Sequence, residues 1–159
     1  MKKIIMSIIA VVAISLSANA QVEDHAIGVR LGGGNYGGGG EISYQHGLGD
    51  ANRLEADFGW SGNNGVSHMR ATAIYQWVFQ LDGALNWYAG PGAQFILASA
   101  GGRSVSAIGV GGDIGIEYNF NEHDVPLAIS LDSRPMFHFG DNYFDSFGWG
   151  AALGIRYTF

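Results

Sequence analysis

The segment at 147–159, FGWGAALGIRYTF, constrains the fold of this chain more than any other stretch, because its residues alternate strictly between two kinds. Every odd-numbered position from Phe147 to Phe159 is apolar or aromatic, whereas every even-numbered position is small or polar and one carries the charge of Arg156. A period of two residues predicts a β-strand with two unlike faces. Such a strand is typical of a membrane barrel, whose apolar face meets lipid and whose small or polar face lines a narrow interior.

The start of the chain has the three parts of a secretory signal peptide. Lys2 and Lys3 form a basic region, 4–16 is an apolar run, and 17–20 (SANA) offers the small residues that a signal peptidase reads. We therefore expect residues 1–20 to be cleaved after Ala20, leaving one domain at 21–159. A short membrane anchor is the less favoured alternative, because the A-x-A ending favours cleavage. The chain has no cysteine, which excludes a lipid-modified cysteine anchor and any disulfide.

The composition of the predicted mature domain is unusual for a water-soluble protein. Both lysines lie in the signal peptide, so six arginines remain against fourteen acidic residues. A soluble domain normally covers its surface with lysine and glutamate, and an acidic domain is a poor partner for nucleic acid. All 26 glycines also lie in this domain, but the abundant aromatic residues and the regular alternation argue against disorder.

Alternating segments recur along the whole mature chain, separated by connections rich in Gly, Asn and Asp. We place them at 25–33, 39–48, 52–61, 67–79, 84–98, 105–120, 125–139 and 147–159. This spacing suits tilted membrane strands of about 10 residues joined by short turns. The sequence therefore predicts an all-β fold, an eight-stranded antiparallel up-and-down transmembrane barrel.

Periodicity alone does not say which face lies inside, because a soluble barrel shows the same alternation inverted. Three features favour a lipid-facing apolar side: missing lysine, a glycine-rich polar face, and aromatic residues gathered near strand ends. Aromatic belts of this kind mark membrane–water interfaces. The predicted interface aromatics are Trp60, Trp77, Phe79, Trp87, Tyr118, Phe120, Trp149, Tyr157 and Phe159.

This orientation sends five arginines and six acidic residues into the barrel. They are Arg30, Glu41, Arg53, Glu55, Asp57, Arg70, Asp113, Glu117, Asp132, Arg134 and Arg156. The interior of an eight-stranded barrel is just wide enough for side chains to fill it, and charges held there need partners. Planar arginine forks bind two carboxylates at once, which explains arginine without lysine. We expect a salt-bridged plug; a narrow path for ions or small solutes is the alternative.

Candidate sites outside this network are few. The external connections are expected at 32–39, 61–67, 98–105 and 140–146, and they are short and rich in small residues. Their bulky groups are expected to anchor loops more often than to recognise a ligand; they are Tyr36, Arg103, Tyr143 and Phe144. The histidines lack metal-ligand spacing. His68 and His138 face inward near the outer end and leave a lipid-modifying enzyme as a third reading, but no nucleophile motif accompanies them. We therefore expect no enzymatic activity, no cofactor and no metal.

Three motifs carry a family resemblance: YAGPGAQF at 88–95, VPLAISLDSRP at 125–135 and GIRYTF at 154–159. With them the mature chain resembles the small eight-stranded outer-membrane β-barrel proteins of the OmpA/OmpX-like superfamily, and the second motif is similar to Bacteroidetes-type barrels. The resemblance implies the outer membrane of a Gram-negative cell, with membrane lipid, periplasmic chaperones and the barrel-assembly machinery as partners. It also implies that Tyr157 and Phe159 form the assembly signal, and we expect a monomer.

The family resemblance does not imply one activity, since members include envelope-integrity proteins, adhesion or resistance factors, narrow pores and a few lipid enzymes. The closed, charged interior favours a structural or envelope-integrity role for this chain. A narrow, porin-like pore for ions or small solutes is the alternative, and a lipid-modifying enzyme is the less favoured third.

Overall fold

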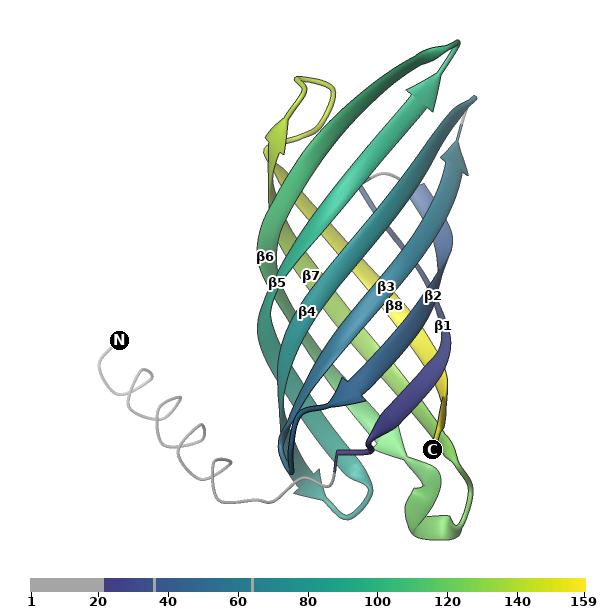
Figure 1. The fold of residues 1–159 in the computed structure, drawn as a ribbon, viewed down its shortest axis with the longest axis vertical. Helices are drawn as coiled ribbons and strands as arrows, with labels where there is room; N and C mark the ends of the chain where they lie inside the picture. Colours follow the sequence, from purple (N-terminus) through teal and green to yellow (C-terminus); the bar gives the residue numbers. More distant parts are fainter. Residues whose placement is uncertain (1–21, 36, 64) are drawn as a thin grey trace, which may run out of the picture.

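A computed structural model describes residues 22–35, 37–63 and 65–159, so the predicted signal peptide lies outside the described residues. The chain forms eight strands and one short 3₁₀ helix (Figure 1). Their bounds are β1 His25–Gly34, β2 Gly37–Gly47, β3 Asn52–Asn63, β4 Val66–Asp82, β5 Leu85–Ala100, β6 Arg103–Asn119, η1 Phe120–His123, β7 Leu127–Gly140 and β8 Phe147–Thr158. Within these ranges, no helix has the length and apolar character needed to cross a membrane.

The strands form one closed antiparallel barrel in which each strand pairs with its neighbour in sequence and β8 returns to β1. The closing seam runs from the pair Ala26–Thr158 to the pair Gly34–Gly150. At its lower end in Figure 1, the His25 amide donates to the Phe159 carbonyl (3.2 Å), and the Phe159 amide donates to the His25 carbonyl (2.9 Å). The predicted up-and-down eight-stranded barrel is confirmed.

The two faces of the wall have opposite chemistry. Inward positions carry most of the buried polar and charged side chains, with Glu55 and Arg156 at 0% exposure. Outward positions carry large apolar side chains, such as Ile108 and Phe139, which are 58% and 63% exposed. A water-soluble protein buries most of its large apolar side chains and exposes its charged ones. This barrel has the opposite arrangement.

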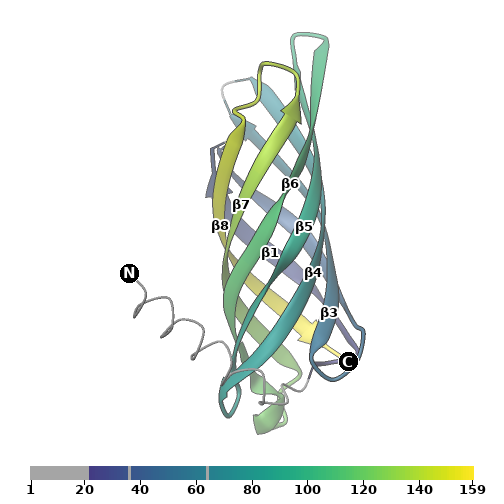
Figure 2. The same ribbon diagram turned by 90° about the vertical axis from the view of Figure 1, so that its left-hand side faces the viewer.

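The strands differ in length around the barrel. β1 and β2 have 10 and 11 residues, whereas β4, β5 and β6 have 17, 16 and 17. The β5–β6 hairpin therefore rises above the rest of the rim (Figure 2). The external connections predicted at 32–39, 61–67 and 98–105 were too long, because their small residues continue the ladder. The β5–β6 turn narrows to Gly101 and Gly102, whose positive φ angles of 55° and 80° suit glycine.

Inward-facing glycines allow this narrow barrel to close. A Cβ atom built on Gly28 would overlap the carbonyl oxygen of Ile155 on β8, and one built on Gly90 would overlap that of Tyr75 on β4. Neither position has room for a side chain. Glycine at these positions permits the close approach of neighbouring strands.

Candidate functional site

The middle of the barrel holds a layer of charged side chains with Glu55 at its centre. Its carboxylate forms ion pairs with Arg134, with Arg156 (Oε1 to Nη2, 3.1 Å) and with Arg30 (Oε1 to Nε, 3.9 Å). The Gln45 amide donates a further hydrogen bond to it at 2.5 Å. Glu55 is fully buried, so these groups replace the water that a carboxylate otherwise requires.

Two arginines extend this layer across the barrel. Arg30 on β1 donates to Asp132 on β7, with Nε 3.1 Å from Oδ2, and pairs with Glu41 on β2. Arg134 on β7 donates from Nη1 to Asp57 on β3 at 2.6 Å. The Arg30–Asp132 and Arg134–Asp57 bonds join strands that are not neighbours in the sheet, and β3 and β7 lie opposite each other in the ring of eight strands.

A second group of polar contacts lies toward the end of the barrel that carries the C-terminus. Arg53 pairs with Glu117 at 2.7 Å and donates to the Gln76 side chain at 2.6 Å. Its guanidinium also stacks 4.8 Å from the ring centre of Tyr88, which is fully buried. Arg156 completes this side by donating to two serine hydroxyls, Ser43 at 3.0 Å and Ser130 at 2.8 Å.

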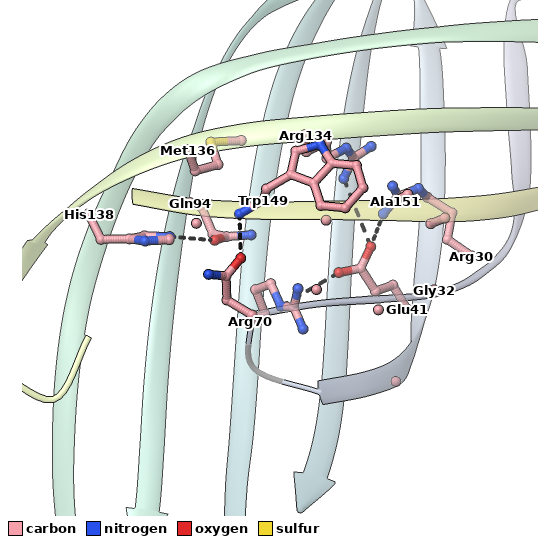
Figure 3. A pocket seen from close by; sticks show the side chains of 17 residues that line it. Arg30, Gly32, Glu41, Arg70, Gln94, Arg134, Met136, His138, Trp149 and Ala151 are labelled. Carbon is pink, nitrogen blue, oxygen red and sulfur yellow. Dashed lines mark hydrogen bonds and ion pairs between the residues drawn. The ribbon is translucent and has the colours of Figure 1, made fainter. Parts of the chain in front are cut away.

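On the other side of the charged layer, toward the β1–β2 turn, lies a cavity of about 60 Å³. Figure 3 shows the side chains that line it. This volume holds about four water molecules, at roughly 15 Å³ each. Eight of its 17 lining residues are glycine or alanine from β1, β2 and β8, which leaves space that larger side chains would otherwise fill. The charged lining includes Glu41, which faces Arg70 at 3.7 Å, and His138 lies 3.4 Å from the amide oxygen of Gln94.

A second cavity, of about 10 Å³, lies below the charged layer and is lined by Arg53, Glu117 and Gln45 among others. The two cavities share no lining residue. On β8, Arg156 lies between Ala152, which lines the upper cavity, and Thr158, which lines the lower one. Arg156 is fully buried, so the charged layer separates the two cavities on this strand.

All eleven charged residues predicted for the interior face inward. The least buried is Arg70, whose side chain is 24% exposed at the outer mouth. Apart from Phe120, the predicted interface aromatics lie on the outer face, and several stack in pairs at the lower end, such as Phe79 with Trp87 (ring centres 4.5 Å apart). Phe120 was expected at the end of a strand but begins η1, where its ring packs edge-on against Tyr118. Sequence reasoning missed three bulky inward side chains of β4 and β5, namely Ile74, Val78 and Ile96. These residues have even numbers, as do the inward polar residues on the same two strands. The alternation along the strand therefore already assigned them to the interior.

His68 and His138, the two histidines considered for a lipid-modifying enzyme, both contact neighbouring polar groups. His138 faces the Gln94 amide and the main-chain carbonyl of Asp145 (3.3 Å), and His68 lies 3.3 Å from the Tyr143 hydroxyl. These contacts orient the two imidazole rings. Among the described residues, no group of three or more His, Cys, Asp or Glu is arranged to hold a metal ion.

The fourth external connection, 141–146, folds back onto the wall. Phe144 is 8% exposed and packs with the inward side chains Ile96, Ala98 and Ala107 near the outer end of β5 and β6. Tyr143 is half exposed and touches His68. Phe144 therefore anchors the loop.

Several solved structures have a fold similar to that of this chain. No protein-family model and no curated protein matches the chain. Among solved structures, Neisserial surface protein A matches with a TM-score of 0.67 at 15% identity, over 85% of this chain and 96% of that one. The N-terminal β-barrel domain of Pseudomonas aeruginosa OprF matches with a TM-score of 0.63 at 16% identity, over 87% of this chain and 100% of that one. Ail, the attachment invasion locus protein of Yersinia pestis, matches with 0.54 at 16% identity, over 87% and 100%. The chain therefore shares the eight-stranded barrel fold of these three proteins.

Proposed function

We propose that this chain is an integral outer-membrane protein whose barrel spans the lipid bilayer. The observation that carries the proposal is the inverted wall: apolar side chains cover the outside, and charged ones fill the inside. A closed barrel satisfies its main-chain hydrogen bonds within the sheet, which a lipid environment requires. The fold shared with known outer-membrane barrels supports the same location.

The proposal includes the route to the membrane. A signal peptide at 1–20 directs export, periplasmic chaperones carry the mature chain, and the barrel-assembly machinery recognises Tyr157 and Phe159. Both side chains project outward and stack on each other, with ring centres 5.9 Å apart. The barrel acts as a monomer in contact with lipid. Its finer assignment to Bacteroidetes-type barrels rests on the motif at 125–135.

We propose a structural, envelope-integrity role without enzymatic activity, because the charged layer obstructs passage through the barrel. Glu55, Gln76, Tyr88 and Arg156 are fully buried in the middle of the interior. Ion pairs between non-neighbouring strands hold this layer in place, and removing one partner of such a pair is costly. The alternative, a narrow pore, draws support from the upper cavity, since it already reaches Arg30 and Arg134.

Tryptophan quenching tests the membrane orientation. All four tryptophans, Trp60, Trp77, Trp87 and Trp149, lie on the outer face, so no inward tryptophan dilutes the signal. In bilayers of brominated phospholipid, we expect quenching of each single-tryptophan variant. Protection of Trp77 and Trp149 from the lipid-borne quencher contradicts the proposal.

Gene deletion tests the envelope role in the bacterium that encodes the protein. We expect the deletion strain to admit bulky hydrophobic dyes faster than its parent, and plasmid-borne wild-type protein to reverse this. Unchanged dye entry, together with slower uptake of small solutes, favours the narrow pore instead.

A further inference from the structure

Two histidines form a cross-strand pair on the outer face, at the end of the barrel that carries the C-terminus. His25 on β1 and His46 on β2 are direct partners in the ladder. Their rings stack with centres 5.0 Å apart, and their Nδ1 atoms are 3.3 Å apart. The Tyr44 hydroxyl, two residues from His46 on the same strand, lies 2.8 Å from the same Nδ1 of His25. Two electron-pair donors, His46 Nδ1 and Tyr44 Oη, thus lie within 3.3 Å of the His25 Nδ1 atom.

The hydrogen bonds at this point do not balance. The Nδ1 of a neutral imidazole carries either one hydrogen or one lone pair. If His25 Nδ1 carries a hydrogen, that hydrogen serves both His46 and Tyr44; if it carries a lone pair, that pair serves two donors. In each case the single hydrogen or lone pair on His25 Nδ1 is shared between His46 and Tyr44. A cation bound there would satisfy the lone pairs of all three side chains.

The separation of the two nitrogens matches the bite of a tetrahedral metal. Zn²⁺ binds imidazole nitrogen at about 2.0–2.1 Å, which sets two such nitrogens roughly 3.3–3.4 Å apart at a tetrahedral angle. The observed 3.3 Å falls at this value. The ladder fixes the two Cα positions opposite each other, so the pair is held close before any ion arrives.

We propose that His25 and His46 bind a transition-metal ion of the Zn²⁺ class through their Nδ1 atoms, with Tyr44 Oη beside the ion and water completing its shell. The site is exposed at the barrel rim and open to dissolved ions. With two imidazole ligands it binds more weakly than a four-ligand structural zinc site. This inference is independent of the proposed envelope role, because it needs only the fold.

The position of the pair gives the ion a structural consequence. The main chain of His25 exchanges two hydrogen bonds with Phe159, and its ring stacks on the Phe159 ring at 5.4 Å. A metal that joins His25 to His46 therefore fastens β1 to β2 beside the seam where β1 closes against β8. Because the ion binds the closed barrel and not the separated strands, it stabilises the fold.

Calorimetric titration of the refolded barrel in detergent micelles with Zn²⁺ alone tests the site. We expect one saturable site at pH 7.5 that weakens at pH 5.5, since imidazole must release its proton to bind metal. His25→Gln and His46→Gln should each weaken binding by more than about tenfold, at least the loss caused by removing an outer-shell partner. His123→Gln is the matched control, because His123 is a single imidazole 3.0 Å from a tyrosine hydroxyl at the same end.

A stability readout guards against misfolded variants. Each variant is first checked for the shift in gel mobility that a folded barrel shows on heating. Zn²⁺ should then raise the unfolding temperature of wild type and His123→Gln, but not of His46→Gln. Wild-type affinity in both His25→Gln and His46→Gln, or no saturable binding up to about 1 mM Zn²⁺, overturns the proposal.

Discussion

The middle of the barrel and its outer mouth are both lined by the inward face of the strands, yet their charged side chains differ in burial and in the number of partners. In the middle, Glu55 is fully buried and faces three arginines. At the mouth, Arg70 is partly exposed, faces Glu41 at 3.7 Å and borders an open cavity. Alternation along a strand therefore assigns a side chain to the interior, whereas the depth of that side chain in the barrel decides how strongly its charge interacts with its neighbours.

The cause of this difference lies in the neighbouring residues. Around Glu55, side chains as large as Tyr88 and Gln76 fill the interior and exclude water. Around Arg70, the opposite wall is glycine and alanine from β1 and β8, so space remains for water. Charges therefore interact strongly in the middle and are screened at the mouth.

The largest effect should come from Glu55→Gln. The substitution leaves buried arginines without their shared carboxylate, and breaking a buried ion pair costs about 3–5 kcal/mol. Urea unfolding of the barrel in micelles measures the loss. Glu122→Gln, in the exposed helix η1, is the control and should leave the unfolding free energy unchanged. Equal stability of the two variants would show that the middle behaves like the mouth.

Phe144→Ala should loosen the mouth without disturbing the middle. Removing a buried phenylalanine side chain forfeits about 1.5–3 kcal/mol of apolar burial. Because Phe144 packs on Ile96 and Ala107, we expect faster hydrogen exchange at 141–146 and at the outer ends of β5 and β6. Exchange that also rises around Glu55 would contradict the separation of the two regions. Tyr143→Phe, which removes one hydroxyl, is the control.

Gly28→Ala tests the close approach of β1 and β8. Its new Cβ would overlap the Ile155 carbonyl, and such overpacking costs about 1–3 kcal/mol. At Gly40, a Cβ would sit at an ordinary 3.5 Å from Leu31, so Gly40→Ala should be tolerated. Thermal unfolding of the two variants measures the difference, and the reverse order would refute this role of Gly28.

The smallest effect should come from Arg70→Ala. The Arg70–Glu41 pair is long and partly exposed, and exposed pairs contribute about 0–1 kcal/mol. Unfolding in urea should detect little change, and the small difference should shrink further in high salt. A loss as large as that of Glu55→Gln would mean that depth does not control these charges.

The strands and their two faces could be predicted from the sequence, but the pairing of individual side chains inside the barrel could not. Strict alternation around Arg156 identified the strand, its faces and the inward charges, because a pleat sends neighbouring residues to opposite sides. It did not predict that Arg30 would pair with Asp132, a partner 102 positions away, because parity names a face and not a partner. Glycine runs near 32–39 looked like loops, but tight pairing of neighbouring strands makes them parts of β1 and β2. The pair His25–His46 likewise depends on the register of that hairpin.

Single-channel recording in a planar bilayer tests whether the charged layer closes the barrel. We expect the pure wild-type protein to show no steady openings at any holding potential. Glu55→Gln should show more frequent brief openings, because the layer loses its central carboxylate. Stable, ion-selective current steps from the wild-type barrel would contradict the closed interior.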